Sequence, residues 1–397
     1  MLTPPDRIAD LHRRLASAVR RDRLLSTACE IVAVPSPTGD AGRAADRLAQ
    51  ILKDDGFDVE RHSAGHDGSP AVVARMESGV PGATLELNGH LDTVHLPFQP
   101  PAVDGALLRG SGACDMKGGL AAAVEALRAL RDVGLPEAGA VMLVAEDLHE
   151  APWGFGEQLD ALIRQGIHGD AVLIPEPLSS HLPLAGRGAA VWKARIEREG
   201  ETVHEVMRPP EAPSVLAAAA DLVLELEALD AKLALDRHPI AGAPSVFVGQ
   251  THGGEIYNQL PRTAVVEGTR RWLAGSSATE VERDFRRLCD GVARRRGVSI
   301  HVEYRQIRGA FALDEGSRLV QAFDQASIAV RGKALERGAK PFVDDGNSFS
   351  ALAGIPAITH GPRAGGQHTV HEWVEIDDLV RVAQLYALTA ALFCSSQ

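Results

Sequence analysis

The chain lacks the sequence features of secreted and membrane-spanning proteins. Its N-terminus, Met1-Leu2-Thr3-Pro4-Pro5-Asp6-Arg7, has no apolar core of the kind found in signal peptides. No charge-free apolar run approaches the roughly 20 residues that cross a bilayer. The four cysteines, Cys29, Cys114, Cys289 and Cys394, show no paired spacing, which is typical of free thiols in a reduced compartment. These absences predict a cytoplasmic protein.

The chain also lacks an excess of basic residues. It contains 53 acidic against 41 basic residues, with a net charge of -12. This balance argues against nucleic-acid binding and against polybasic attachment to a membrane. At 397 residues the chain exceeds one typical hydrophobic core, so we expect two domains.

A histidine and a carboxylate stand two residues apart where a strand-like run ends, at Leu87-Asn88-Gly89-His90-Leu91-Asp92. Residues i and i+2 of a strand share a face, so His90 and Asp92 can point at one spot. A hydrogen-bonded loop element is one interpretation of such a pair. A divalent metal site is another, because a zinc-bound imidazole usually donates a hydrogen bond from its second ring nitrogen to a carboxylate or a carbonyl.

Further oxygen and nitrogen donors follow other predicted elements. Asp115 stands in a glycine-flanked turn before a helical run rich in Ala and Leu, and Glu150 and Glu176 each follow an apolar strand-like stretch. His368 lies in a glycine-rich loop. Carboxylates and neutral imidazoles suit zinc, cobalt or manganese, so these residues and His90 predict a site for two divalent ions.

In this order and context, the motifs resemble those of the metal-dependent aminoacylase and carboxypeptidase family, which includes acetylornithine deacetylase, succinyl-diaminopimelate desuccinylase and glutamate carboxypeptidase. The resemblance runs from about Ala28 to the C-terminus. It implies that Asp115 bridges two ions and that Asp92 orients the first histidine. The ligand set that it implies is His90, Asp115, Glu150, Glu176 and His368.

One position departs from the family pattern. The family normally has Asp-Glu-Glu after this strand, the first Glu being the general base and the second a ligand, whereas this chain has Leu148-His149-Glu150. His149 therefore stands where the base is expected. Glu146 and Asp147 are an alternative candidate for the acidic pair of the family. Aligning them with that pair, however, inserts three residues, Leu148 to Glu150, before the next turn. On a continuing strand Glu146 would also lie roughly 13 Å from Glu150.

Three interpretations of His149 remain open. In the first it is the general base, because unperturbed imidazole titrates at about 6.5, although two nearby dications disfavour its charged form. In the second it is an additional ligand, and Glu150 is the base of a one-metal site. In the third, hydrolysis is impaired.

Strand-like runs alternate with amphipathic helices from Asp40 to Glu176, which predicts an α/β domain with a mixed sheet and helices on both faces. From Gly186 the order of strands and helices becomes self-contained, which predicts an inserted α+β domain. We expect the metal-binding catalytic domain at residues 1–187 and 305–397 and the inserted domain at 188–304. The resemblance implies that the inserted domain is a lid that mediates dimerisation.

Three residues of the inserted domain match family positions. The resemblance implies that His204 reaches the active site, often that of the partner subunit, and steadies the oxyanion; a lone histidine after a strand is also a common surface residue. Asn258 and Arg271 match positions that hold the carboxylate of the substrate. Arg270 competes with Arg271 for this role, in which a planar guanidinium can bind a carboxylate through two hydrogen bonds.

Together these features predict a homodimeric metallohydrolase with two divalent ions, zinc first and cobalt or manganese as alternatives. Its expected substrate is a small molecule with a carboxylate, an N-acyl amino acid or a small peptide-like compound, whose amide bond is cleaved by activated water. We expect no nucleic-acid or membrane partner. His149 keeps two alternatives open: a one-metal hydrolase with an altered reaction such as hydrolytic deamination, and a metal-containing binding protein without turnover.

Overall fold

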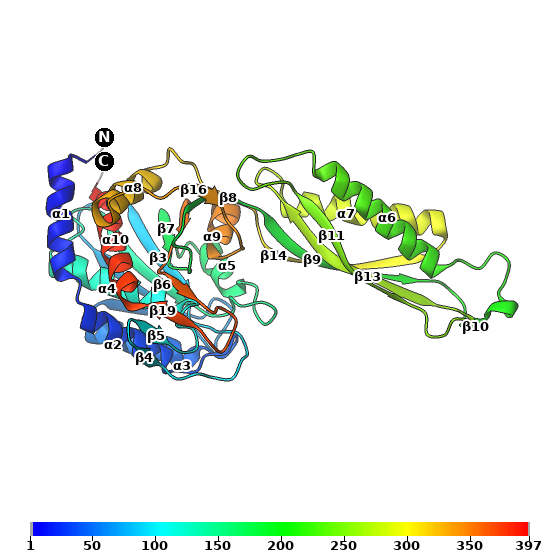
Figure 1. Cartoon of the computed structure of the whole chain (residues 1–397), viewed down its shortest axis with the longest axis horizontal. Helices are drawn as coiled ribbons and strands as arrows, with labels where there is room; N and C mark the ends of the chain where they lie inside the picture. Colours follow the sequence, from blue (N-terminus) through cyan, green and yellow to red (C-terminus); the bar gives the residue numbers. More distant parts are fainter. Residues whose placement is uncertain (1–2, 396–397) are drawn as a thin grey trace. The chain divides into compact units, whose positions relative to one another are not determined.

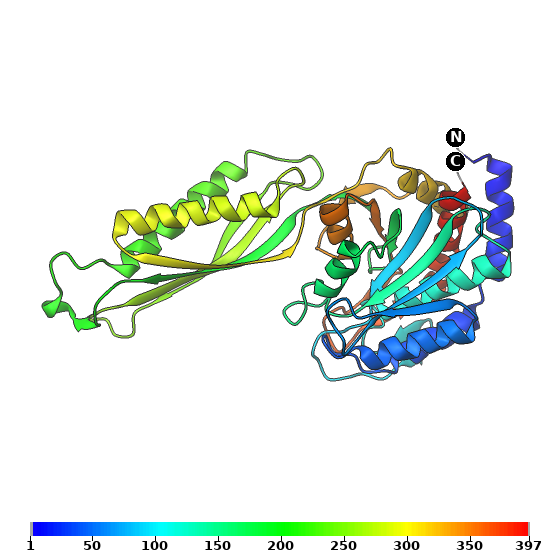
Figure 2. The ribbon, with the colours of Figure 1, turned by 180° about the vertical axis from the view of Figure 1, so that it is seen from behind.

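The computed structural model describes residues 3–395, which form two compact units. Unit 1 comprises the chain up to Leu184, Ala312–Ala339 and the chain from Asp344 onward. Unit 2 comprises Ala185–Phe311 with Lys340–Val343. Figure 1 and Figure 2 present the elements of each unit from opposite sides. The chain first crosses between the units three residues before the expected boundary at 187/188.

Unit 1 is built on a six-stranded mixed sheet with the order β1-β2-β6-β3-β7-β17. Neighbours in the run β6-β3-β7-β17 pair in parallel, whereas β2 pairs antiparallel with both of its neighbours. Strand β6 is buried along its whole length, as its unbroken apolar sequence from Ala140 to Ala145 predicts for a strand covered on both faces. The strands are β1 (Asp58–His62), β2 (Ala71–Glu77), β3 (Thr84–His90), β6 (Ala140–Glu146), β7 (Ala171–Ile174) and β17 (Ala357–Thr359).

Helices cover both faces of this sheet (Figures 1 and 2). Leu162 of α5 packs with Met142 and Val144 of β6, and α4 and α10 also pack against β3 and β6. The predicted fold class, an α/β domain with a mixed sheet plus an inserted α+β domain, is therefore confirmed. The helices of unit 1 are α1 (Pro5–Ala18), α2 (Arg21–Val32), α3 (Gly42–Asp54), α4 (Lys117–Asp132), α5 (Glu157–Arg164), α8 (Arg318–Arg331), α9 (Asp345–Ser348) and α10 (Ile376–Ser395), with a π-helical turn at Phe349–Ala353.

The remaining short strands form a second sheet in unit 1 or lie where the chain passes from one unit to the other. A four-stranded sheet has the order β18-β19-β5-β4. Its strands are β4 (Ala102–Asp104), β5 (Leu107–Arg109), β18 (Ala364–Gly365) and β19 (Trp373–Glu375). Where the chain crosses from one unit to the other lie β8 (Leu182–Gly186), β15 (Phe311–Ala312) and β16 (Arg337–Ala339).

Helix α10 is long and apolar enough, by length and composition, to cross a membrane. However, 78% of its apolar window is buried inside the structure, where it packs against α4 and α8. Its first turn carries two carboxylates, Asp377 and Asp378. This burial is typical of a core helix.

Unit 2 is a four-stranded antiparallel sheet, β11-β13-β9-β14, with two long helices on one face (Figure 1). Its core joins Trp192 of the sheet to Phe285 of α7, whose rings lie 4.9 Å apart. Alternate residues of β9 are buried, which is the pattern of a sheet with one covered face. The elements are β9 (Gly188–Glu197), β10 (Val203–His204), a 3₁₀ turn (Glu205–Met207), α6 (Val215–Leu233), β11 (Ser245–Gly253), β12 (Gln259–Leu260), β13 (Thr263–Trp272), α7 (Ala278–Arg296) and β14 (Ser299–Arg308).

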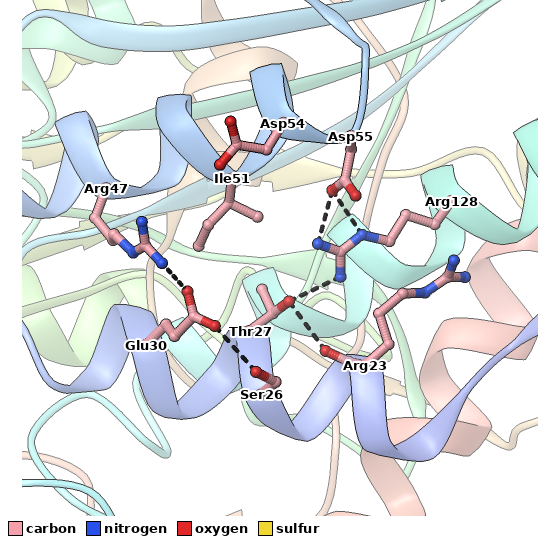
Figure 3. A pocket seen from close by; sticks show the side chains of 9 residues that line it. All are labelled: Arg23, Ser26, Thr27, Glu30, Arg47, Ile51, Asp54, Asp55 and Arg128. Atoms are coloured by element: carbon pink, nitrogen blue, oxygen red, sulfur yellow. Dashed lines mark hydrogen bonds and ion pairs between the residues drawn. The ribbon is translucent and has the colours of Figure 1, made fainter.

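A pocket of about 320 Å³ lies among α2, α3 and α4 in unit 1. Figure 3 shows that two of its guanidinium groups face carboxylates: Arg47 pairs with Glu30, and Arg128 pairs with Asp55 at 2.7 Å. Arg128 also donates to the hydroxyl of Thr27. This network ties α2, α3 and α4 together, so we interpret the pocket as a structural junction between helices.

Candidate metal centre

Three neighbouring parallel strands bring candidate ligands to one edge of the unit 1 sheet. His90 is the last residue of β3, Glu150 follows β6, and Glu176 follows β7. Because parallel strands end on the same side, the loops after their carboxyl ends meet there. The parallel pairing of these strands thus explains why His90, Glu150 and Glu176, which are 60 and 26 positions apart in the sequence, converge.

Asp115 reaches the same place from the turn before α4. The carboxylate of Glu372 accepts hydrogen bonds from the backbone N–H groups of Cys114 and Asp115, both at 3.1 Å, and so fixes the turn. Gly119, in the first turn of α4, lies so close to the β7 loop that an added Cβ would be 2.2 Å from the carbonyl oxygen of Pro175. Only glycine allows this approach, which brings the Asp115 turn beside Glu176.

The carboxylate of Asp115 lies between two imidazoles. Its Oδ1 is 3.2 Å from Nε2 of His90, and its Oδ2 is 3.5 Å from Nε2 of His368. Nε2 of His90 is also 3.6 Å from Oε1 of Glu176, and Nε2 of His368 is 3.1 Å from Oε2 of Glu150. The five expected ligands therefore form one cluster, with Asp115 at its centre.

The buried acidic groups of this cluster form an environment that favours bound cations. Burial, and then the charge of Asp115, raise the pKa of Glu176 to about 8. Hydrogen bonds to Asp115 and then to Glu150 raise the pKa of His368 to about 10. Buried carboxylates at this density need compensating positive charge, which protons or divalent ions can supply. The ligand atoms of His90, Asp115 and Glu150 lie within 4.8 Å of one another, close enough to hold an ion together.

His149 lies against the cluster. Its ring stacks on that of His90, with centroids 4.0 Å apart and 13° between the planes. Its Nε2 is 3.6 Å from Oε1 of Glu176, and the ligand atoms of His90, His149 and Glu176 form a second group that could hold an ion. The geometry is thus compatible with His149 as a base or as a ligand.

Asp92 holds the loop that carries His149. Its carboxylate accepts hydrogen bonds from the backbone N–H groups of His149, at 3.1 and 3.3 Å, and Glu150, at 3.1 Å. Nδ1 of His90 is nearer to the carbonyl oxygen of Asp92, at 3.0 Å, than to its carboxylate, at 3.6 Å. Burial, the largest single effect, would raise the pKa of Asp92, but the hydrogen bond and charge of His90, together with His149 and the backbone N–H of Glu150, lower it.

The alternative acidic pair faces other partners. Asp147 accepts from the backbone N–H groups of Gly39 and Ala41, both at 2.9 Å, and so fastens the loop before α3. Glu146 accepts from the side-chain amide of Asn88 at 3.2 Å. Burial, followed by the charge of Asp345, raises the pKa of Glu146 well above its usual range. These contacts favour the register in which His149 replaces the usual glutamate.

Two residues at the cluster carry roles that the sequence pattern did not indicate. Asp345, the first residue of α9, is buried, and its Oδ1 lies 2.8 Å from Nδ1 of His149. Glu372 is the carboxylate that fixes the Asp115 turn. Neither lies near its partner in sequence, although each acid stands in a short polar segment next to an apolar strand-like run.

Two of the three candidate residues of unit 2 are in contact. His204 and Asn258 lie together, with Nε2 of the histidine 3.1 Å from Nδ2 of the amide. Arg271 is half-buried in β13, and burial, followed by the charge of Arg187, lowers its pKa. The competing Arg270 is buried and donates to the backbone carbonyls of Ser245 and Arg271, which favours Arg271 as the candidate anion-binding residue.

Residues 87–392 match the model of peptidase family M20/M25/M40. The chain belongs to this family. The predicted resemblance to metal-dependent aminoacylases and carboxypeptidases is confirmed, and so is the prediction of a metallohydrolase. Membership makes this M20 chain a metal-dependent enzyme of amide hydrolysis, acting on acyl amino acids or peptides.

Curated relatives of this M20 chain include the succinyl-diaminopimelate desuccinylases of Halorhodospira halophila and Stenotrophomonas maltophilia strain K279a. The first is 27% identical over 382 residues, covering 91% of this chain and 96% of the relative. The second is 28% identical over 381 residues, covering 91% and 97%. The similarity therefore extends over nearly the whole of both proteins.

Solved structures share the fold. Aminopeptidase PepT from Bacillus cereus has a TM-score of 0.80 at 20% identity, with 95% of this chain and 99% of that chain covered. The YXEP protein of Bacillus subtilis, described as a dinuclear metal-binding peptidase of the M20 family, has a TM-score of 0.70 at 16% identity, with the same coverage. At these identities the likeness establishes the fold.

Proposed function

We propose that this M20 enzyme hydrolyses the amide bond of an N-acyl amino acid or small peptide-like substrate at a site with two divalent ions, zinc being the first candidate. The observation that carries the proposal is the position of Asp115 between His90 and His368, with one carboxylate oxygen toward each imidazole. This is the arrangement that a bridging ligand requires.

The chain offers a ligand set for each ion. His90, Glu176 and Oδ1 of Asp115 would hold one ion. Glu150, His368 and Oδ2 of Asp115 would hold the other. Divalent ions at such a site lower the pKa of water and polarise a carbonyl oxygen, which is the chemistry needed to attack an amide.

His149 is our candidate general base. Its Nδ1 is occupied by Asp345, and its Nε2 faces the cluster, 3.6 Å from Glu176. A base in this place would take the proton of the attacking water at Nε2 and return it to the leaving amine. Imidazole has a suitable intrinsic basicity for this transfer at neutral pH.

Unit 2 would supply substrate contacts. In this proposal His204 donates a hydrogen bond to the developing oxyanion, and Asn258 and Arg271 bind the substrate carboxylate. The half-buried guanidinium of Arg271, with Arg187 close enough to lower its pKa, suits an anionic group. We further propose that the enzyme is cytoplasmic and that unit 2 mediates a homodimer.

A second candidate function is a one-metal hydrolase with an altered reaction. The group formed by His90, His149 and Glu176, whose ligand atoms lie within 4.8 Å of one another, favours it. In that site His149 would be a ligand, and Glu150 would be the base.

Metal analysis coupled to a substrate screen separates the two functions. The purified enzyme is assayed with N-succinyl and N-acetyl amino acids and with dipeptides, the first because relatives are named as desuccinylases. Two ions per chain together with amide hydrolysis support the main proposal. One ion per chain at full activity supports the second candidate. Two ions without hydrolysis of any amide would refute the proposed reaction.

A further inference from the structure

Three contacts hold His149, one at its backbone and two at its imidazole ring. Its backbone N–H donates to the carboxylate of Asp92, at 3.1 and 3.3 Å. One face of its ring rests on His90, 4.0 Å away between centroids. Its Nδ1 lies 2.8 Å from Oδ1 of Asp345. Together these contacts leave Nε2 directed at the metal cluster, 3.6 Å from Glu176.

Asp345 comes to this contact from a distant and well-anchored segment. It lies 196 residues from His149 in the sequence and opens the short helix α9. The preceding residue, Asp344, caps this helix: its carboxylate accepts from the backbone N–H of Gly346 at 2.8 Å and from the hydroxyl of Thr359 at 2.7 Å. Asp345 is itself fully buried, and a buried carboxylate is costly unless it is paired.

We propose that Asp345 is a positioning residue that allows His149 to replace the usual glutamate, so that the two residues act as one matched pair. The carboxylate accepts a hydrogen bond from the N–H at Nδ1, which fixes the tautomer and turns the lone pair of Nε2 toward the reacting water. The inference rests on the proposed role of His149 as the base. It adds that this role requires a carboxylate at position 345.

If Asp345 acts by orienting His149, it should suit a histidine at position 149 but not a glutamate. A glutamate at position 149 would bring a second carboxylate toward Asp345, and like charges at close range repel. The charge of Asp345, after burial, already helps to raise the pKa of the neighbouring Glu146. Restoring the common glutamate alone is therefore expected to be unfavourable, and removing the charge of Asp345 is expected to relieve it.

A double-mutant cycle on the full metal-loaded enzyme tests this pair, using Asp345→Asn, His149→Glu and the double variant. With His149 present, Asp345→Asn is expected to lower kcat about 10²- to 10⁴-fold with little change in KM, because the amide can donate to Nδ1 and favour the wrong tautomer. In the His149→Glu background, the same change is expected to raise kcat.

Asp344→Asn is the matched control. Asp344 is the neighbouring buried acid, and its carboxylate accepts hydrogen bonds from the backbone N–H of Gly346 and from the hydroxyl of Thr359 in β17. Its replacement is expected to act with the same sign and size in both backgrounds. The opposite signs predicted for Asp345→Asn would therefore be specific to the residue that contacts His149.

Two readouts do not depend on turnover. The melting temperature, compared at equal metal content, should fall with Asp345→Asn in the His149 background and rise in the His149→Glu background. Nitrogen NMR should find a protonated Nδ1 on His149, lost in Asp345→Asn. Equal effects in both backgrounds, or an unprotonated Nδ1 with Asp345 present, would overturn the inference. If no variant hydrolyses any amide, the proposed function fails, while these two readouts still decide whether Asp345 orients His149.

Discussion

His90 and His149 stack face to face, with ring centroids 4.0 Å apart, and Nε2 of each lies 3.6 Å from the same oxygen of Glu176. One of these imidazoles is an expected ligand, and the other occupies the position of the family's usual base. Because both Nε2 atoms lie at the same distance from Glu176, either imidazole could serve as a metal ligand. His149 is a ligand if its Nε2 binds an ion, and a base if its Nε2 takes a proton from water.

Replacing His149 by alanine distinguishes these roles. If His149 is the base, His149→Ala should retain both ions and lose about 10²- to 10⁴-fold in kcat, the usual contribution of general base catalysis. Metal content is measured on the same sample as the rate. A loss of metal in proportion to activity would instead make His149 a ligand, and Glu150→Gln should then abolish turnover while some metal stays bound.

Replacing ligands should remove ions selectively. His368→Ala is expected to lose the ion shared with Glu150, and Asp115→Ala is expected to lose both, because its two oxygens face different imidazoles. Activity should fall with the metal in each variant, while the fold persists because the buried sheet does not depend on the ions. Elemental analysis and circular dichroism provide the measurement.

The exposed His371, in the same loop as His368, offers a control. His371→Ala should keep both ions and its activity. Unchanged metal content in His368→Ala and Asp115→Ala would contradict the ligand assignment.

His204 should affect the rate without affecting the metal. His204→Ala is expected to lower kcat about 10²- to 10³-fold, the cost of removing one oxyanion donor, at unchanged metal content. His252→Ala alters another exposed histidine of unit 2 and should be silent. Full turnover in well-folded His204→Ala would show that the role implied by the family resemblance does not apply to this enzyme.

His360 should make stability depend on pH. Burial, followed by the charge of Arg331, lowers the pKa of this histidine to about 3. The unfolded chain takes up a proton near the ordinary value of about 6.5, so stability is full above that pH and decreases as pH falls toward 3. Between pH 7 and pH 5 this one group should remove about 2 kcal/mol of unfolding free energy.

Denaturant unfolding of His360→Gln at both pH values tests this expectation. The variant should lose less stability than the parent protein between pH 7 and pH 5. His301→Gln, which changes an exposed histidine, is the control and should keep the parent's pH dependence. An identical pH dependence in His360→Gln would rule out this contribution.

The sequence predicted the elements that have a regular period. The apolar run Ala140 to Ala145 coincides with β6, Ala140–Glu146. Three of the expected ligands lie at or after the carboxyl ends of β3, β6 and β7. Since three of the strands are parallel neighbours, their following residues His90, Glu150 and Glu176 meet.

The remaining contacts depend on tertiary packing and have no local signature. Asp345 opens a helix of four residues, too short for a helical period, and contacts a residue 196 positions away. Glu372 similarly reaches back to Asp115 across the fold. Asp92 was expected to orient His90, but its carboxylate also fastens the backbone of His149 and Glu150, which spacing along a strand could not indicate.

Zinc titration of the metal-free enzyme, followed by binding calorimetry and by amide hydrolysis on the same samples, tests the central claim most directly. A site bridged by Asp115 predicts two equivalents of zinc per chain, with activity still rising between the first and the second. Saturation of both binding and hydrolysis at one equivalent would contradict it.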